Sequence, residues 1–113
     1  MPKRIESILE HITYYCMEIQ NSRKRYGDSW ECFSADRDFQ RSVCMCLIQI
    51  GELVRILPEE FRVKHTEIPW KQICGLRNIV VHAYGEVDFE SIFDIIIGDI
   101  PVLERFCREW RQL

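Results

Sequence analysis

Apolar residues recur every three to four positions along most of this chain, and this spacing limits its fold more than any other feature. The longest stripe predicts a helix that is capped by Ser34 or Asp36 and ends near Pro58. An earlier stripe predicts a helix over about residues 5–20. No segment alternates persistently at period two, the pattern of a half-buried strand. The sequence therefore predicts an all-α fold, an up-down four-helix bundle with a short C-terminal helix.

Turn and cap residues divide the second half of the chain into the remaining helices. Pro69 suits the first position of a third helix, and Gly85 is its expected left-handed end. Asp88 caps a fourth helix. A break begins at Gly98, after which Pro101 opens the short last helix.

Length and composition indicate one small globular domain over residues 1–113. Hydrophobic residues make up 47% and charged residues 29%, which is a globular balance. No apolar run approaches the roughly 20 residues that cross a bilayer, and the N-terminus lacks the apolar core of a secretory signal. We therefore expect a cytoplasmic protein without membrane contact. Because small domains have modest cores, a second copy or a partner chain is also expected.

The six cysteines lie mostly within apolar stretches, and no Cys-x-x-Cys pair is present. Reduced thiols that pack as small hydrophobes fit this pattern better than disulfides or a metal site. A metal protein built on a helix bundle is also disfavoured, because it would need a Glu-x-x-His arrangement and the sequence has none.

The segment from Leu76 to Tyr84 concentrates the side chains that carry chemistry. Arg77 can clamp a phosphate with paired donors, and His82 can exchange a proton near neutral pH. Together they suffice for RNA cleavage without a metal, if one group takes the 2′-hydroxyl proton and the cation stabilises the charged transition state. A salt bridge for Arg77 and a simple helix-end position for His82 are the alternatives that spacing alone leaves open.

Helical geometry constrains how these residues meet. Asn78 and His82 are four positions apart and share a face, whereas Arg77 and His82 are about 140° apart around a helix. The arginine must swing, the helix must unwind, or a second copy must supply the missing group. Glu52, on the long helix, either orients Arg77 through a salt bridge or is simply exposed. Gly51 beside it costs about 1 kcal/mol relative to alanine in a helix, so we expect another helix to approach closely there.

The chain resembles the HepT-like branch of the HEPN superfamily over nearly its whole length. The family motif Arg-x-x-x-x-His-x-Tyr matches at Arg77, His82 and Tyr84. A lone Arg-x-x-x-x-His is weak evidence, but here other family motifs accompany it in the expected order. These are Ile50-Gly51-Glu52, Ile68-Pro69-Trp70, Val87-Asp88 and Ile100-Pro101-Val102-Leu103.

The resemblance implies a metal-independent endoribonuclease toxin of a type VII-like MNT–HEPN toxin–antitoxin system, without a cofactor. It implies a homodimer in which Arg77 and His82 of both subunits line a shared cleft, Arg77 holding the scissile phosphate and His82 acting as general acid or base. Asn78 supports the cleft, and Glu52 is a weaker supporting candidate. Tyr84 is the position that the MNT-type nucleotidyltransferase antitoxin modifies with AMP. The added bulk and charge, two residues from His82, would block the cleft and repel RNA.

A second function stays open, a non-catalytic HEPN accessory or substrate-binding subunit of a nucleotidyltransferase. The net charge of -3 counts mildly against a general nucleic-acid binder, since such domains usually carry a basic surplus. It is compatible with a ribonuclease whose cleft is locally basic, where Lys71 and Arg55 would add to Arg77.

Overall fold

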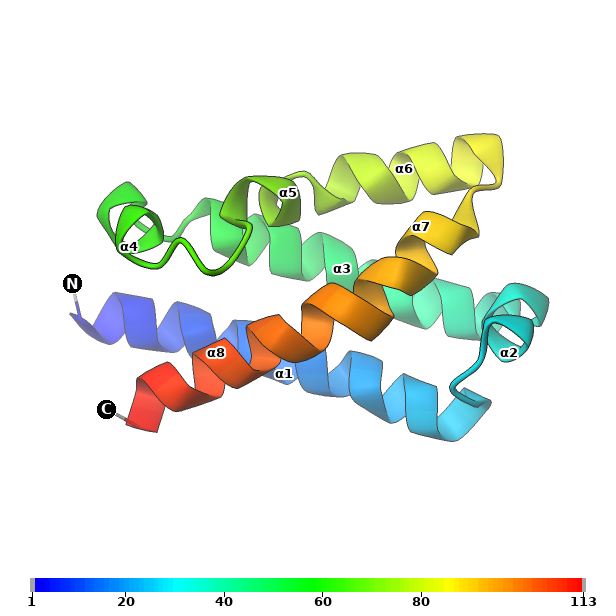
Figure 1. Cartoon of the computed structure of the whole chain (residues 1–113), viewed down its shortest axis with the longest axis horizontal. Coiled ribbons are helices and arrows are strands. Elements are labelled where there is room, and N and C mark those ends of the chain that lie inside the picture. Colours follow the sequence, from blue (N-terminus) through cyan, green and yellow to red (C-terminus); the bar gives the residue numbers. More distant parts are fainter. Residues whose placement is uncertain (1, 113) are drawn as a thin grey trace.

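A computed structural model describes residues 2–112, with side chains for residues 4–110, and this part of the chain is helical without strands (Figure 1). The all-α prediction is therefore confirmed over these residues. No described helix is long and apolar enough to cross a membrane. The elements are α1 (Pro2–Tyr26), α2 (Trp30–Ala35), α3 (Arg37–Arg55), α4 (Glu59–Lys64), α5 (Trp70–Cys74), α6 (Leu76–Glu86), α7 (Phe89–Asp94), the π-helix η1 (Ile95–Asp99) and α8 (Ile100–Gln112).

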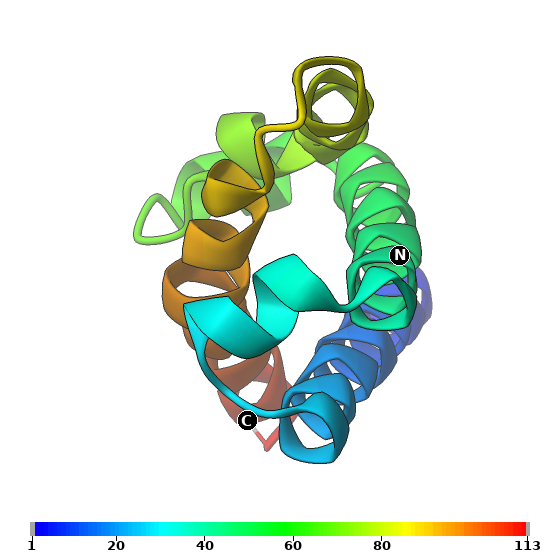
Figure 2. The same ribbon diagram turned by 90° about the vertical axis from the view of Figure 1, so that its right-hand side faces the viewer.

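Helices α1 and α3 run side by side in opposite directions, and the segment from α7 to α8 crosses them diagonally (Figure 1). Helix α6 packs on the other side of α3, so that these helices surround one apolar core when viewed end on (Figure 2). Four of the six cysteines are buried in this core, as the packing interpretation predicted: Cys16, Cys44, Cys46 and Cys107. Cys32 and Cys74 are half-buried.

Helix α1 extends six residues beyond the predicted end at Gln20, because side chains there find partners. Ser22 is buried, and its hydroxyl lies 3.0 Å from that of Ser42 on α3. Arg23 donates to both carboxylate oxygens of Asp28, at 2.7 and 2.9 Å. The helix ends where Gly27 takes a left-handed φ of 108°, a conformation open to glycine.

The predicted cap of α3 is confirmed at Asp36, whose side chain accepts from the backbone N–H groups of Asp38 and Phe39 at 2.9 and 3.1 Å. The short helix α2 before it was not predicted. Ser29 caps α2. The buried Phe33 of α2 anchors this helix to the core. Figure 2 shows α2 lying across one end of the molecule, where it later forms one wall of the functional region.

The close approach expected at Gly51 is confirmed. A Cβ atom there would lie 3.0 Å from the carbonyl oxygen of Ile73 and 3.4 Å from Cβ of Leu76. The junction between α5 and α6 therefore rests directly on α3. The single third helix predicted from Pro69 was wrong, since the chain turns at Gly75 and divides it into α5 and α6.

The predicted helix end at Gly85 was also wrong. Helix α6 continues to Glu86, and Val87 takes the left-handed conformation with φ 56°. The carbonyl of Ala83 accepts from both Val87 N–H and Asp88 N–H, the latter at 2.9 Å, which satisfies the helix end. Val87 is 78% exposed, so its position is set by the backbone rather than by packing of its side chain.

The predicted cap at Asp88 is confirmed, because its carboxylate accepts from Ser91 N–H at 3.5 Å and Ser91 hydroxyl at 2.9 Å. The break predicted at Gly98 is instead a π-helical turn, and the helical segment continues into α8. Pro101 has no N–H and clashes with the carbonyl four residues earlier, a conflict that a wider π turn relieves. The expected short last helix is thus a 13-residue α8 that continues α7.

The contact at Gly51 gives the first prediction. Gly51→Ala should lower the free energy of unfolding by about 1–3 kcal/mol, because its Cβ meets a backbone carbonyl that cannot step aside. Urea denaturation measures the change. The matched control is Gly98→Ala, where nothing lies within 4 Å of the added Cβ, and which should leave stability equal or higher. A Gly51→Ala protein as stable as the wild type would contradict the packing of α5 and α6 on α3.

Candidate functional site

All four candidate residues of the motif lie on α6 and are exposed: Arg77, Asn78, His82 and Tyr84. The helix is continuous between them, so the unwinding considered from the sequence does not occur. Its buried face is formed by Leu76, Val80 and Ala83. The candidate residues therefore share the exposed side of a short helix that α3 supports from below.

This exposed side presents two separate sets of groups. Tyr84 follows Arg77 by seven positions, so the two lie within about 20° of each other around α6. Asn78 and His82 share a second face, about 100–140° away from Arg77. Among the described side chains, Arg77 and His82 have no hydrogen-bond or ion-pair partner, so both groups are available to a ligand. With unwinding removed, a swing of the arginine or a second copy of the chain remains as the way to join Arg77 to His82.

Glu52 is exposed, and its carboxylate lies 4.0 Å from the guanidinium of Arg55, one turn further along α3. Within residues 4–110 it forms no ion pair with Arg77. Of the two options that the sequence left open for Glu52, the structure has the exposed one. An exposed pair at this distance contributes little to stability.

Arginines follow the side of α3 that faces α6. Arg41 lies 3.7 Å from Asp38, with both side chains mostly exposed. Arg37 and Arg77 have no carboxylate within 4.0 Å among the described side chains. Arg55 follows Gly51 by one turn and so lies on the same side of α3. This face is locally basic although the whole chain carries a charge of -3.

Tyr84 is held by contacts on two sides of its ring. It meets the ring of Phe89 on α7 edge to face, with centroids 5.0 Å apart. Its hydroxyl forms a hydrogen-bonding contact with the thiol of Cys44 on α3. The residue is nevertheless 48% exposed, so these contacts orient the side chain while about half of its surface faces the outside.

Both groups are protonated near neutral pH, as an ordinary thiol and phenol are, and their surroundings raise both pKa values further. Burial raises the pKa of the Cys44 thiol to about 11, and the hydrogen bond with Tyr84 opposes that rise. Burial also raises the pKa of Tyr84, the neighbouring Cys44 adds to this, and Arg41 opposes it. Tyr84 is therefore a neutral phenol that needs an external base to act as a nucleophile.

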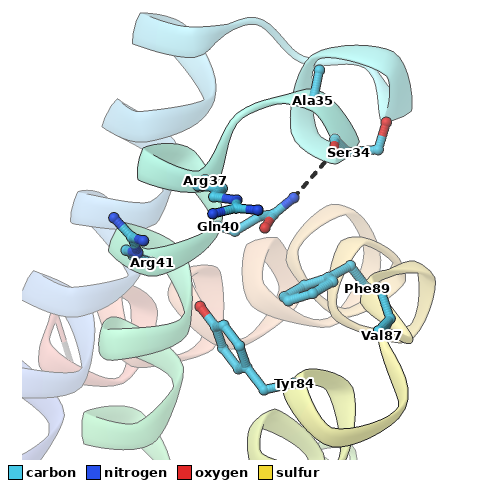
Figure 3. A pocket seen from close by; sticks show the side chains of 8 residues that line it. All are labelled: Ser34, Ala35, Arg37, Gln40, Arg41, Tyr84, Val87 and Phe89. Atoms are coloured by element: carbon cyan, nitrogen blue, oxygen red, sulfur yellow. Dashed lines mark hydrogen bonds between the residues drawn. The ribbon is translucent and has the colours of Figure 1, made fainter.

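A pocket of about 450 Å³ opens beside Tyr84 (Figure 3). Figure 3 shows the Tyr84 hydroxyl pointing from α6 toward α3, on the side of Arg41. The sequence analysis missed this pocket, because its walls come from four separate elements. The only available signal was the pair of arginines one turn apart at the start of α3. The lining residues are Ser34, Ala35, Arg37, Gln40, Arg41, Tyr84, Val87 and Phe89.

Comparison with known proteins gives a consistent result. The family model described as "Ribonuclease HepT-like" matches residues 4–110. A protein of Caldanaerobacter subterraneus subsp. tengcongensis named a "Putative RNase" is 40% identical over 104 residues, which cover 92% of this chain and 91% of that protein. A "Putative RNase" of Methanocaldococcus jannaschii is 32% identical over 106 residues, 93% of this chain and 86% of that protein. The "Probable ribonuclease HepT" of Thermococcus cleftensis is 35% identical over 75 residues, 66% of this chain and 68% of that protein. No solved structure matches.

The buried thiols give a prediction on pH. Burial raises the pKa of Cys44 and of Cys46 from the ordinary 9.0 to about 11 in the folded chain. Between these values the unfolded chain releases thiol protons that the folded chain keeps, so the free energy of unfolding should fall as pH rises from about 9 to 11. Urea denaturation across this range measures the slope. Cys44→Ala/Cys46→Ala should flatten it, and an equal slope in both proteins would contradict burial of these thiols.

Proposed function

Because the chain belongs to the HepT-like ribonuclease family, we propose that it is a metal-independent endoribonuclease and the toxin of an MNT–HEPN toxin–antitoxin system. The observation that carries this proposal is the free exposure of Arg77 and His82 on one rigid helix. Neither side chain is occupied by another described group. A catalytic role requires that both groups be available to the substrate, as they are here.

The proposed reaction is an internal transfer at the RNA phosphate. A base removes the proton of the ribose 2′-hydroxyl, and the oxygen forms a bond to the adjacent phosphorus. The bond from phosphorus to the 5′-oxygen of the next nucleotide breaks, and that oxygen gains a proton. The products are a 2′,3′-cyclic phosphate and a 5′-hydroxyl end. His82 supplies or accepts these protons, Arg77 stabilises the extra negative charge on the phosphate, and Asn78 supports the same cleft.

We further propose that the active cleft forms between two copies of the chain. Arg77 and His82 leave a continuous helix about 140° apart, so a phosphate beside His82 of one chain is met more directly by Arg77 of a second copy. A two-fold axis beside α6 would bring Arg77 of one subunit opposite His82 of the other. In this assembly α1, α3, α5–α6 and α7–α8 act as the four segments of an up-down bundle. Arg55 and Lys71, both exposed, would add positive charge to the cleft.

Control by a nucleotidyltransferase antitoxin is the remaining part of the proposal. The Tyr84 oxygen attacks the α-phosphorus of ATP, the Oη–P bond forms, and the bond to the β-phosphate breaks to release pyrophosphate. The phenol proton passes to a base of the antitoxin, because the raised pKa of Tyr84 leaves this chain without a ready phenolate. The 48% exposure of Tyr84 and its place on the wall of a pocket support it as the acceptor.

One observation also favours the second function, a non-catalytic accessory or substrate-binding subunit of a nucleotidyltransferase. Tyr84 and its pocket are complete within one chain, whereas the Arg77–His82 pair is not. Under this alternative the purified chain would become modified at Tyr84 yet would not cleave RNA. Cleavage assays on the purified protein therefore separate the two functions.

The catalytic roles give the third prediction. His82→Ala and Arg77→Ala should each lower the rate of RNA cleavage by about 10²–10⁴-fold, because proton transfer and charge stabilisation act in the transition state. EDTA should leave the wild-type rate unchanged. His11→Ala and Arg105→Ala remove exposed groups of the same kinds on α1 and α8, and should cleave like the wild type. Equal cleavage by His82→Ala and the wild type would contradict the proposal.

The shared cleft gives the fourth prediction. Arg77→Ala and His82→Ala proteins should each be inactive alone, and unfolding and refolding them together should restore about a quarter of the wild-type activity. Half of the dimers would then be mixed, and each mixed dimer would hold one intact cleft out of two. Mixing either variant with itself under the same protocol is the control. If the mixture stays inactive although mixed dimers form, the two groups of each cleft come from one chain.

A further inference from the structure

The pocket beside Tyr84 has walls of contrasting chemistry. Arg37 and Arg41 stand one turn apart on α3, and Figure 3 shows both guanidinium groups on one side of the pocket. Arg37 has no carboxylate partner among the described side chains, and Arg41 has only the exposed Asp38 at 3.7 Å. The aromatic ring of Phe89 lies on the opposite side (Figure 3). Paired guanidinium groups favour a phosphate, and a ring favours a flat aromatic group.

Gln40 adds a fixed acceptor to this pocket. It is only 9% exposed, and its Nε2 donates to the carbonyl oxygens of Phe33 at 2.9 Å and Ser34 at 3.3 Å. These two bonds set the orientation of the amide, and its Oε1 is turned toward the pocket (Figure 3). None of the hydrogen bonds of the described residues uses this oxygen. A buried amide with a free acceptor is suited to an amine or a hydroxyl of a ligand.

The pocket has the size of a site for one small ligand rather than for a strand. Its volume of about 450 Å³ falls within the range of small-molecule sites. Helix α2 borders it at Ser34 and Ala35, and the turn after α6 borders it at Val87. The pocket combines guanidinium groups that can donate hydrogen bonds to a phosphate, an aromatic ring and one fixed acceptor. This combination in this volume matches a single nucleotide.

The hydroxyl of Tyr84 opens into the same pocket, on the side of Arg41 (Figure 3). A phosphorus joined to that oxygen must therefore lie inside the pocket or at its rim. His82 is two residues away along α6, which places it about 160° around the helix. A nucleotide on Tyr84 consequently lies away from His82 of its own chain and on the face of Arg77, about 10 Å along the axis.

We propose that Arg37 and Arg41 bind the phosphate of a nucleotide joined to Tyr84, with its base against Phe89 and a polar group on Gln40. This proposal rests on the proposed modification of Tyr84. It adds that the modification docks on its own chain and is not a loose appendage over His82. The docked phosphate neutralises part of the basic face of α3 and α6, so it weakens the attraction of RNA to Arg77.

RNA itself is a less suitable occupant of this pocket. A polynucleotide needs an open path on both sides of each bound unit, whereas α2 borders this pocket on one side and the turn at Val87 borders it on another. Any occupant must also fit beside the Tyr84 hydroxyl. A nucleotide that is covalently joined to this oxygen meets the requirement because the oxygen is part of it. We therefore treat an RNA unit in the pocket as an outcome of the test.

Calorimetric titration of the unmodified wild-type chain with AMP tests the pocket first. We expect one AMP per chain, with adenosine and inorganic phosphate each binding at least tenfold more weakly. Arg37→Ala/Arg41→Ala should weaken AMP binding at least tenfold. The control Arg4→Ala/Arg105→Ala removes two exposed arginines that do not line the pocket and should bind AMP like the wild type. Absent AMP binding, or equal binding by the two double variants, would overturn the proposal.

The chain produced together with its antitoxin provides the second arm. Intact mass should show added AMP, lost in Tyr84→Phe, and the modified chain should no longer bind free AMP because its pocket is filled. If the modified chain carries added AMP and still binds free AMP, docking of the joined nucleotide in the pocket is overturned. The modification of Tyr84 would then stand. Arginine-dependent AMP binding without added mass would instead refute the modification of Tyr84 and, with it, a tethered nucleotide. A loss of RNA cleavage in unmodified Arg37→Ala/Arg41→Ala as large as that in Arg77→Ala would show that the pocket holds RNA, which also overturns the proposal.

Discussion

The contact of α3 with the α5–α6 junction at Gly51 is the constraint on which the site depends. Because Gly51 has no side chain, the carbonyl oxygen of Ile73 and the Cβ of Leu76 can lie close to the backbone of α3. A Cβ atom at Gly51 would be only 3.0 and 3.4 Å from these two atoms. Helix α6 begins at this point, and Arg77 is its second residue. The position of the arginine is therefore set by backbone packing rather than by an ion pair with Glu52. Backbone contacts hold a group more rigidly than a long exposed salt bridge does.

The rigidity of α6 has a consequence for function. A continuous helix fixes the angles between its side chains, so Arg77 and Tyr84 share one face while Asn78 and His82 share another. Residues that are adjacent in the motif thus belong to two different surfaces. One surface continues into the arginines of α3 and the pocket at Tyr84, and the other is open to a second molecule. In the proposed assembly, this division would link the cleft between two copies to control by charge at a neighbouring face.

Much of the fold could be predicted from the sequence because its signals are local. The stripe of α3 and the caps at Asp36 and Asp88 act within a few residues, and Gly51 signals a close approach because glycine is otherwise unfavourable within a helix. The errors arose where distant contacts prevailed. Ser22 prolongs α1 through a partner on α3, and Gly85 stays helical because the Ala83 carbonyl finds its N–H donors at Val87 and Asp88, beyond the glycine. The short α2 depends on burial of Phe33 among aromatic rings from other helices.

The sequence by itself determined the helical class, the family and the residues of the motif, because periodicity, caps and short motifs are written along the chain. Only the tertiary structure decided what surrounds those residues. It separated Glu52 from Arg77, brought Cys44 against Tyr84 and joined α2, α3, α6 and α7 around one pocket. These relations connect positions up to about 50 residues apart, and helical periodicity carries no information on such pairs. The packing of α6 on α3 determines which of these distant positions lie together.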